Sequence, residues 1–145
     1  MKILFVCTGN TCRSPMAEGL FREMVRRHGL EGEILCQSAG LSAVEGDPVA
    51  ENALTACREV GVDLTGHTAR RVTGEELPEW DAFFVMSKTQ AYILERAGAP
   101  ANQIYVPSYI EDPFGGDLET YRRCREKLAR ELERFWTEAL GLPAD

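Results

Sequence analysis

Short apolar runs alternate along the chain with longer stretches in which apolar residues recur every three or four positions. Four runs have the length and composition of strands, at residues 2–7, 33–38, 81–86 and 103–106. The first and third are almost continuously apolar, which is typical of strands buried on both faces of a sheet. Strands that alternate with amphipathic helices indicate βαβ units, and therefore a parallel sheet of the α/β class.

The stretch after the first strand has helical spacing. Its apolar positions are Ala17, Leu20, Phe21, Met24 and Val25. We expect Ser14 to cap this helix and Pro15 to take its first position, where the missing N–H costs nothing. Gly29 is expected to end it, because glycine readily adopts the left-handed conformation found after helices.

Three further helices have recognisable starts. Asp47 followed by Pro48 is expected to open the second helix, Ser87 and Gln90 to form a capping box for the third, and Asp117 to cap a long last helix. Parallel strands joined by helical crossovers leave a ligand crevice beyond their carboxyl ends. Residues that carry chemistry are therefore expected at that edge of the sheet.

Composition limits the class of protein. The 145 residues include 16 Lys and Arg against 23 Asp and Glu, so the net charge is −7. With 44% hydrophobic residues, no repeat and no linker, residues 1–145 are expected to form a single domain. The negative charge argues against a nucleic-acid surface. The first thirty residues are nevertheless electropositive, and they contain the most unusual segment of the chain.

The apolar runs and the cysteines bear on location and redox state. The apolar run near the N-terminus is far shorter than a membrane span, and no signal-peptide pattern follows it, so the sequence predicts a cytoplasmic protein without a membrane segment. The cysteines lack the CxxC pairing of zinc sites or disulfide scaffolds, so neither a metal nor a cofactor is expected. They are Cys7, Cys12, Cys36, Cys57 and Cys124.

The segment after the first strand holds the candidate chemistry. Cys7 ends the strand, Arg13 follows six positions later at a helix start, and Gly9 lies in the turn between them. Such a turn can point successive N–H groups into a concave nest that suits a phosphate-sized anion, and the helix dipole adds positive charge. The same field stabilises the thiolate of Cys7 as a nucleophile. The alternative is a buried strand-end cysteine and a solvated arginine.

The ten residues Val6-Cys7-Thr8-Gly9-Asn10-Thr11-Cys12-Arg13-Ser14-Pro15, together with Asp112-Pro113-Phe114, resemble the low-molecular-weight protein tyrosine phosphatase family. The resemblance covers essentially the whole chain. It implies a three-layer sandwich in which a four-stranded parallel sheet of order 2-1-3-4 has helices on both faces. It also implies that residues 8–12, from Thr8 to Cys12, surround the phosphate.

Roles carry over onto the matching positions. The resemblance implies that Cys7 is the nucleophile, Arg13 the residue that clamps the phosphate, and Asp112 the acid that protonates the leaving group and later activates water. A phosphocysteine would form between the two steps. Read without the family, Asp112 is equally an aspartate that caps a turn.

The family also assigns supporting residues. Ser14 matches the serine that hydrogen-bonds the thiolate, and Asn10 matches the asparagine that holds the loop in shape with help from positions matching Ser38 and His67. Read without the family, His67 is a surface-loop histidine. Cys12 matches a cysteine that can form a reversible disulfide with the nucleophile, and packing alone is the alternative.

Two positions bear on the substrate. Tyrosine-directed members commonly have isoleucine where this chain has Thr11, and they often carry aromatic residues after the Asp-Pro. Thr11 followed by Asp112-Pro113-Phe114-Gly115-Gly116 looks like the protein arginine phosphatase branch. A threonine hydroxyl can accept N–H groups of a phosphorylated guanidine, and Phe114 can stack on its plane. Thr11 as a neutral variant of a tyrosine phosphatase is the alternative.

Rival functions remain open at this stage. They are an arsenate reductase, which would need further cysteines near the third strand, a phosphocysteine carrier, and a phosphate-binding module that does no chemistry. The presence of both Arg13 and Asp112 favours hydrolysis. Phosphorylated proteins are the expected partners, and the chain is expected to be a monomer.

Overall fold

A computed structural model describes residues 1–144. Its strands are β1 (Lys2–Cys7), β2 (Leu35–Gly40), β3 (Ala82–Phe84) and β4 (Ile104–Tyr105). Its α-helices are α1 (Arg13–Arg27), α2 (Glu51–Arg58), α3 (Lys88–Arg96) and α4 (Leu118–Arg134). Two 3₁₀ turns, η1 (Gly74–Glu79) and η2 (Ala101–Gln103), precede β3 and β4, and a π-helical turn, η3 (Phe135–Ala139), extends α4.

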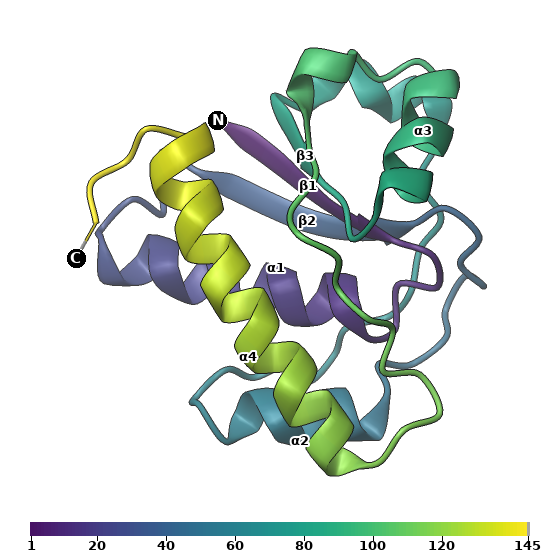
Figure 1. Cartoon of the computed structure of the whole chain (residues 1–145), viewed down its shortest axis with the longest axis vertical. Helices are drawn as coiled ribbons and strands as arrows, with labels where there is room; N and C mark the ends of the chain where they lie inside the picture. Colours follow the sequence, from purple (N-terminus) through teal and green to yellow (C-terminus); the bar gives the residue numbers. More distant parts are fainter. Residues whose placement is uncertain (145) are drawn as a thin grey trace.

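The strands form one parallel sheet in the order β2-β1-β3-β4, which confirms the predicted order. Side chains of β1 alternate between two cores. Ile3, Phe5 and Cys7 pack with α1, α2 and α4, whereas Leu4 and Val6 pack with α3 and η1. Figure 1 shows the strands running between α3 on one side and α1 and α4 on the other. The predicted three-layer α/β sandwich is confirmed.

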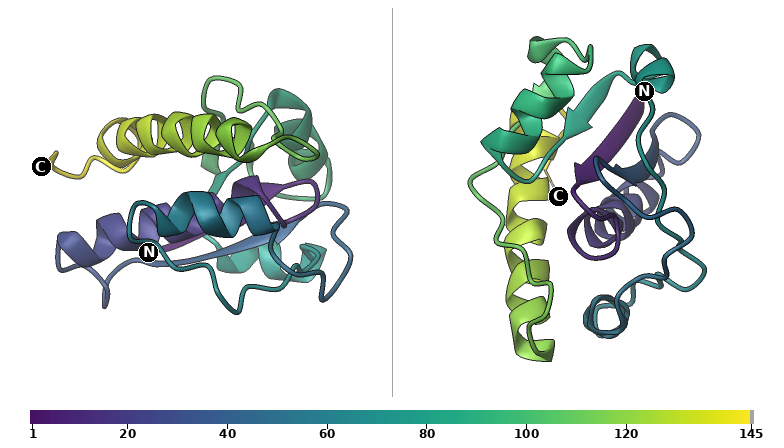
Figure 2. Two further views of the ribbon diagram at one scale, coloured as in Figure 1. Left: turned by 90° about the horizontal axis from the view of Figure 1, so that it is seen from below. Right: turned by 90° about the vertical axis from the view of Figure 1, so that its right-hand side faces the viewer.

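The long helix α4 organises the larger of these two helical layers. It packs against both α1 and α2, and the left view of Figure 2 shows α4 (yellow-green) running above these two helices. Asp117 caps it as expected, because its carboxylate accepts the Thr120 N–H at 2.9 Å. Ser87 likewise caps α3. None of the helices within residues 1–144 is long and apolar enough to cross a membrane.

Two predicted helix starts were wrong, each for an identifiable reason. The first residue of α1 is Arg13 and its N-cap is Cys12, so Ser14 is not a cap and Pro15 stands third in the helix. The Ser14 hydroxyl hydrogen-bonds Cys7 instead. The second helix starts at Glu51 rather than at the Asp47-Pro48 pair. Pro48 forms an isolated bridge with a neighbouring loop, which keeps this segment extended.

The strand limits also differ from the predicted ones. The second strand begins and ends two residues later than expected, and the third and fourth are shorter. The later end of β2 places Gly40 opposite Cys7 in the parallel register. This pairing brings the end of β2 against the loop that follows β1.

Candidate active site

The loop from Cys7 to Arg13 connects the carboxyl end of β1 to the first turn of α1. Both residues are almost fully buried, with 3% and 6% of their surface exposed. The loop forms the floor of a pocket of about 240 Å³. Its lining consists of the whole loop together with Ser42, Val44, Asp47, Asp112 and Phe114. The predicted nucleophile, clamp and acid thus share one pocket.

Two hydrogen bonds hold the sulfur of Cys7. The Asn10 backbone N–H donates to Sγ at 3.3 Å, and the Ser14 Oγ lies 2.8 Å from Sγ. Asn10 Nδ2 donates to the same Ser14 oxygen at 2.8 Å, so that contact does not use the hydroxyl hydrogen of Ser14. Ser14 therefore has its own hydrogen to give to sulfur. The Cys7 sulfur therefore lies between the Asn10 N–H and the Ser14 hydroxyl.

Asn10 uses every polar group that it has. Its Nδ2 donates to Ser38 Oγ at 3.0 Å as well as to Ser14, and its Oδ1 accepts the Arg70 backbone N–H at 2.9 Å. His67 Nε2 lies 2.8 Å from the Asn10 carbonyl, which can only accept, so Nε2 carries the proton. With φ at 56°, Asn10 adopts the left-handed conformation, which asparagine tolerates better than most residues. These hydrogen bonds hold the loop from Cys7 to Arg13 in its turned conformation.

The loop has further support that sequence reasoning missed. Ser38 Oγ donates to Glu18 Oε1 at 2.6 Å, which fixes the far end of the Asn10 contacts. A Cβ on Gly40 would lie 2.6 Å from the Thr8 carbonyl oxygen and 3.1 Å from the Asn10 Cβ. The loop can lie this close to β2 only because Gly40 has no side chain. The parallel pairing of β1 with β2, which places Gly40 opposite Cys7, was the signal that could have identified Gly40.

Gln90 is another residue that the sequence did not single out for the site. Only 4% of its surface is exposed. Its Oε1 accepts the Met86 N–H at 2.8 Å, and its Nε2 donates to Thr8 Oγ1 at 3.2 Å. The contact leaves the Thr8 hydroxyl hydrogen free for another acceptor. Gln90 thus links the end of the third strand to the phosphate loop.

Arg13 reaches from the floor of the pocket to the segment that carries Asp112. Its Nη1 donates to the Ile110 carbonyl at 2.9 Å, and its Nη2 lies 3.6 Å from Asp112 Oδ2. The Asp112 side chain is 51% exposed and also accepts the Phe114 N–H at 3.1 Å. Phe114 itself is 76% exposed. The acid therefore lies at the solvent side of the pocket that has Cys7 at its floor.

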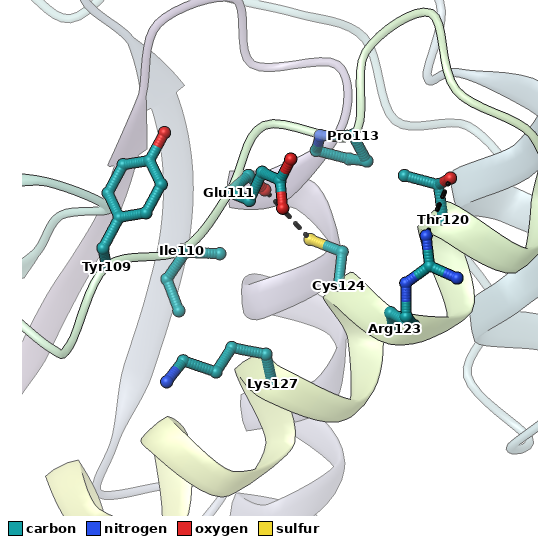
Figure 3. Close-up of a pocket in the computed structure, with 8 residues that line it drawn as sticks. All are labelled: Tyr109, Ile110, Glu111, Pro113, Thr120, Arg123, Cys124 and Lys127. Carbon is teal, nitrogen blue, oxygen red and sulfur yellow. Dashed lines mark hydrogen bonds between the residues drawn. The ribbon is translucent and has the colours of Figure 1, made fainter.

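A second cavity lies behind the acid-bearing segment. Its volume is about 410 Å³, and Figure 3 shows Glu111 and Pro113 on one side of it and side chains of α4 on the other. Cys124 Sγ donates to the Glu111 carbonyl at 3.9 Å, which is a weak contact. The stretch from Glu111 to Pro113 therefore borders a cavity, although Ile110 beside it is buried in the core.

The remaining cysteines differ from Cys7 in their surroundings. Burial raises the pKa of Cys36 to about 11 and the pKa values of Cys57 and Cys124 to about 12. Burial also raises the pKa of Cys12, whose Sγ lies 3.3 Å from the Tyr121 hydroxyl. All four are therefore held as thiols. A disulfide between Cys7 and Cys12 stays a prediction.

This arrangement suits an in-line displacement at phosphorus. Arg13 supplies positive charge at the floor, a sulfur lies beside hydrogen-bond donors, and a carboxyl group lies toward the solvent. Within residues 1–144, no three His, Cys, Asp or Glu side chains are grouped so that they could hold a metal ion. Fold and site together define a phosphate-handling cysteine protein of the α/β class.

Comparisons with known proteins agree with this class. Residues 2–141 match the family described as low molecular weight phosphotyrosine protein phosphatase. A protein-arginine-phosphatase of Bacillus subtilis is 32% identical over 144 residues, covering 93% of this chain and 94% of the relative. The low molecular weight protein-tyrosine-phosphatase YfkJ of the same organism is 34% identical over 122 residues, covering 81% and 78%.

Solved structures give the same result. A Cys-to-Ser mutant of the arginine phosphatase YwlE with a phosphorylated active-site serine has a TM-score of 0.85 at 30% identity, covering 99% of this chain and all of the other. A low molecular weight protein tyrosine phosphatase from T. tengcongensis has a TM-score of 0.85 at 34% identity, covering 93% and 97%. The chain is a phosphatase, and it belongs to the low molecular weight phosphotyrosine protein phosphatase family.

Proposed function

We propose that this phosphatase removes the phosphoryl group from phosphoarginine side chains of proteins, through a phosphocysteine on Cys7. The observation that carries the proposal is the placement of its sulfur. It accepts hydrogen bonds from Ser14 and Asn10 at the floor of a pocket that also contains Arg13 and Asp112. A thiolate held in this way is a nucleophile aimed at a bound phosphoryl group.

In the first step, the thiolate of Cys7 attacks phosphorus and a new S–P bond forms. The P–N bond to the guanidine breaks, its electron pair goes to nitrogen, and Asp112 gives that nitrogen a proton. Arg13 and the loop N–H groups stabilise the equatorial oxygens in the transition state. The chain supplies this positive charge itself, so the proposed steps need no metal.

In the second step, a water oxygen attacks the phosphorus of the phosphocysteine. The S–P bond breaks and its electron pair returns to sulfur, while the Asp112 carboxylate takes a proton from the water. The Ser14 hydroxyl favours sulfur as the leaving group because its hydrogen bond stabilises the returning thiolate. Inorganic phosphate then leaves, and the enzyme is ready for another cycle.

Two features support arginine as the phosphorylated residue. Thr11 lines the pocket with a hydroxyl that can accept guanidine N–H groups, where a bulky aliphatic side chain would suit a phenyl ring. Asp112 lines the same pocket with a carboxylate, which can also accept guanidine N–H groups. Relatives named protein-arginine-phosphatase match almost the whole chain at 32% and 34% identity.

The test compares two peptides of one sequence, phosphorylated either on arginine or on tyrosine. We expect kcat/KM to be about tenfold or more higher for phosphoarginine, because a site that hydrogen-bonds a polar group discriminates against an analogue without it. The Thr11→Ile variant should shift the ratio toward phosphotyrosine, and Cys7→Ser should lose both activities. A wild-type enzyme that hydrolyses phosphotyrosine equally well or better would contradict the assignment.

Phosphotyrosine is the second candidate substrate. The observation that favours it is the apolar character of part of the rim, where Val44 and Phe114 are 62% and 76% exposed and line the pocket. Apolar side chains at this position can contact a phenyl ring. The same mechanism applies, with a phenolate oxygen in place of the guanidine nitrogen.

A further inference from the structure

Two segments form the walls of the active-site pocket above the phosphate loop. The segment before α2 contributes Ser42, Val44 and Asp47, and the segment before α4 contributes Asp112 and Phe114. The role of Asp112 follows from the proposed mechanism. Asp47 stands in the same pocket, and the proposed phosphoryl transfer does not use it.

The backbone around Asp47 is fixed. Its N–H donates to the Val44 carbonyl at 3.1 Å, and its carbonyl accepts the Ala69 N–H at 2.8 Å. The next residue, Pro48, is bridged to Thr68. The Asp47 carboxylate, in contrast, makes no hydrogen bond or ion pair with any residue in the range 1–144. Its oxygens are available to a ligand while its position is constrained.

The wall segment is also joined to the phosphate loop. The Ser42 N–H donates to the Thr8 carbonyl at 3.0 Å, and the Ala50 N–H donates to the Thr11 carbonyl at 2.9 Å. Asp47 lies between these two attachment points. The backbone of Asp47 is therefore held in register with the loop that receives the phosphoryl group.

The charges in the pocket follow an order. Arg13 and the loop N–H groups make the floor positive, whereas Asp47 and Asp112 make the walls negative. Val44 and Phe114 add exposed apolar surface to the same pocket. Phosphoarginine has the matching order, with an anionic phosphoryl group followed by a planar cation. In phosphotyrosine the phosphoryl group is followed by a neutral ring, which gains nothing from two carboxylates.

We propose that Asp47 is a specificity-determining residue that accepts an N–H of the substrate guanidinium. Val44 and Phe114 contact the faces of the guanidinium group, and Asp112 contacts the nitrogen that leaves phosphorus. This assignment rests on the proposed arginine phosphatase function. It adds a residue that binds the cation without taking part in the transfer of the phosphoryl group.

The experiment measures KM and kcat of wild type, Asp47→Asn and Glu45→Gln on the arginine- and tyrosine-phosphorylated forms of one peptide. Glu45 is the matched control, because it lies in the same segment and carries the same charge but does not line the pocket. Its carboxylate accepts the Arg71 N–H at 2.7 Å, a bond that glutamine can retain. Comparing the two variants therefore separates a local contact from the general effect of removing one negative charge.

We expect Asp47→Asn to raise KM for phosphoarginine about fivefold, the upper range for an exposed charge pair, with little change in kcat. KM for phosphotyrosine should stay the same or fall, and Glu45→Gln should change neither substrate. A loss of stability would affect both substrates alike, so equal effects on the two would overturn the role of Asp47. The same holds if Asp47→Asn has no effect or if Glu45→Gln matches it.

The wild-type measurement tests the underlying function separately. If wild type hydrolyses phosphotyrosine but not phosphoarginine, the proposed function fails and the assignment of Asp47 fails with it. If wild type prefers phosphoarginine and Asp47→Asn keeps that preference, the function stands and only the inference about Asp47 is wrong.

Discussion

The two segments that meet at the active site are built in opposite ways. Asn10 and Ser14 in and beside the phosphate loop are fully buried, and each makes several hydrogen bonds. On the acid-bearing segment, Asp112 is half exposed, Phe114 is largely exposed, and a cavity of about 410 Å³ lies behind the chain. The phosphate site is thus preformed, whereas the acid is held at a few points only.

One of those points is Arg13. Its Nη1 donates to the Ile110 carbonyl, so the side chain that we propose to clamp the phosphate also fastens the segment that carries Asp112. The Ile110 N–H donates to the Met86 carbonyl at 3.2 Å, and the Ser108 N–H donates to the buried Glu131 carboxylate at 2.9 Å. We therefore expect substitutions in the phosphate loop to abolish activity on every substrate. The activity lost through substitutions in the acid-bearing segment should depend on the leaving group.

The largest effect is expected from Arg13→Lys, because lysine keeps the charge but loses the paired donors that contact phosphate oxygens and the Ile110 carbonyl at once. We expect kcat/KM to fall about 10²- to 10³-fold on any substrate. Arg26→Lys, on an exposed ion pair of the same helix, is the control and should change nothing. A loss of less than tenfold would show that the two segments do not depend on Arg13.

The Asp112→Asn variant should separate the acid from the phosphate loop. We expect about a 10²-fold loss in kcat/KM, which reports the first step alone, with a poor leaving group and a much smaller loss in kcat/KM with p-nitrophenyl phosphate, whose leaving group needs no proton. Because Asp112 is exposed, the midpoint of thermal unfolding should stay the same. Glu111→Gln serves as the neighbouring control. Equal losses on both substrates would contradict the role of Asp112 as the acid.

Close packing of the phosphate loop can be tested with two glycines. A Cβ on Gly40 would lie 2.6 Å from the Thr8 carbonyl oxygen, whereas a Cβ on Gly9 would lie 3.8 Å from its nearest neighbour, Thr11 Oγ1. We expect Gly40→Ala to lower the free energy of unfolding by about 1–3 kcal/mol and to reduce kcat, with a smaller effect on stability for Gly9→Ala. Urea unfolding and steady-state kinetics measure both. Similar values for the two variants would mean that the loop is not tightly packed against β2.

The smallest effect concerns acid stability. Burial alone would raise the pKa of Glu76, but hydrogen bonds from Arg70 and Thr73 outweigh it and hold the pKa at about 2, below the ordinary 4.5. The stabilisation is therefore complete above about pH 4.5 and is lost as the pH falls toward 2. Glu76→Gln should unfold with a weaker pH dependence across that range. An unchanged pH dependence would mean that this ion pair does not support Arg70, whose N–H holds Asn10.

The sequence predicted the parts of the site that lie in one contiguous stretch. Cys7 and Arg13 were predictable because a strand end, a turn and a helix start follow one another, which fixes their spacing in space as well as along the chain. The same stretch produced one error. Ser14 has the residue type of a helix cap, but its hydroxyl is committed to the sulfur of Cys7, and nothing local distinguishes the two uses.

Residues that reach the loop from elsewhere were not predictable from local signals. Gln90 was read as part of a capping box, yet its side chain bonds Met86 and Thr8, because the third strand ends beside the first. Gly40 matters only through its register opposite Cys7. Glu18 acts through Ser38, a contact between a helix and a strand. Each of these contacts depends on tertiary packing rather than on sequence spacing.

The central claim is that phosphoarginine is hydrolysed through a covalent phosphoryl group on Cys7. The most direct measurement is rapid acid-quenched mass spectrometry of the wild-type enzyme mixed with an arginine-phosphorylated protein, sampled within the first turnover. The account predicts one added phosphoryl group on the peptide that contains Cys7, and none in a Cys7→Ala variant, which has no nucleophile at this position. Turnover without a phosphoryl group on Cys7, or with the group on another residue, would contradict it.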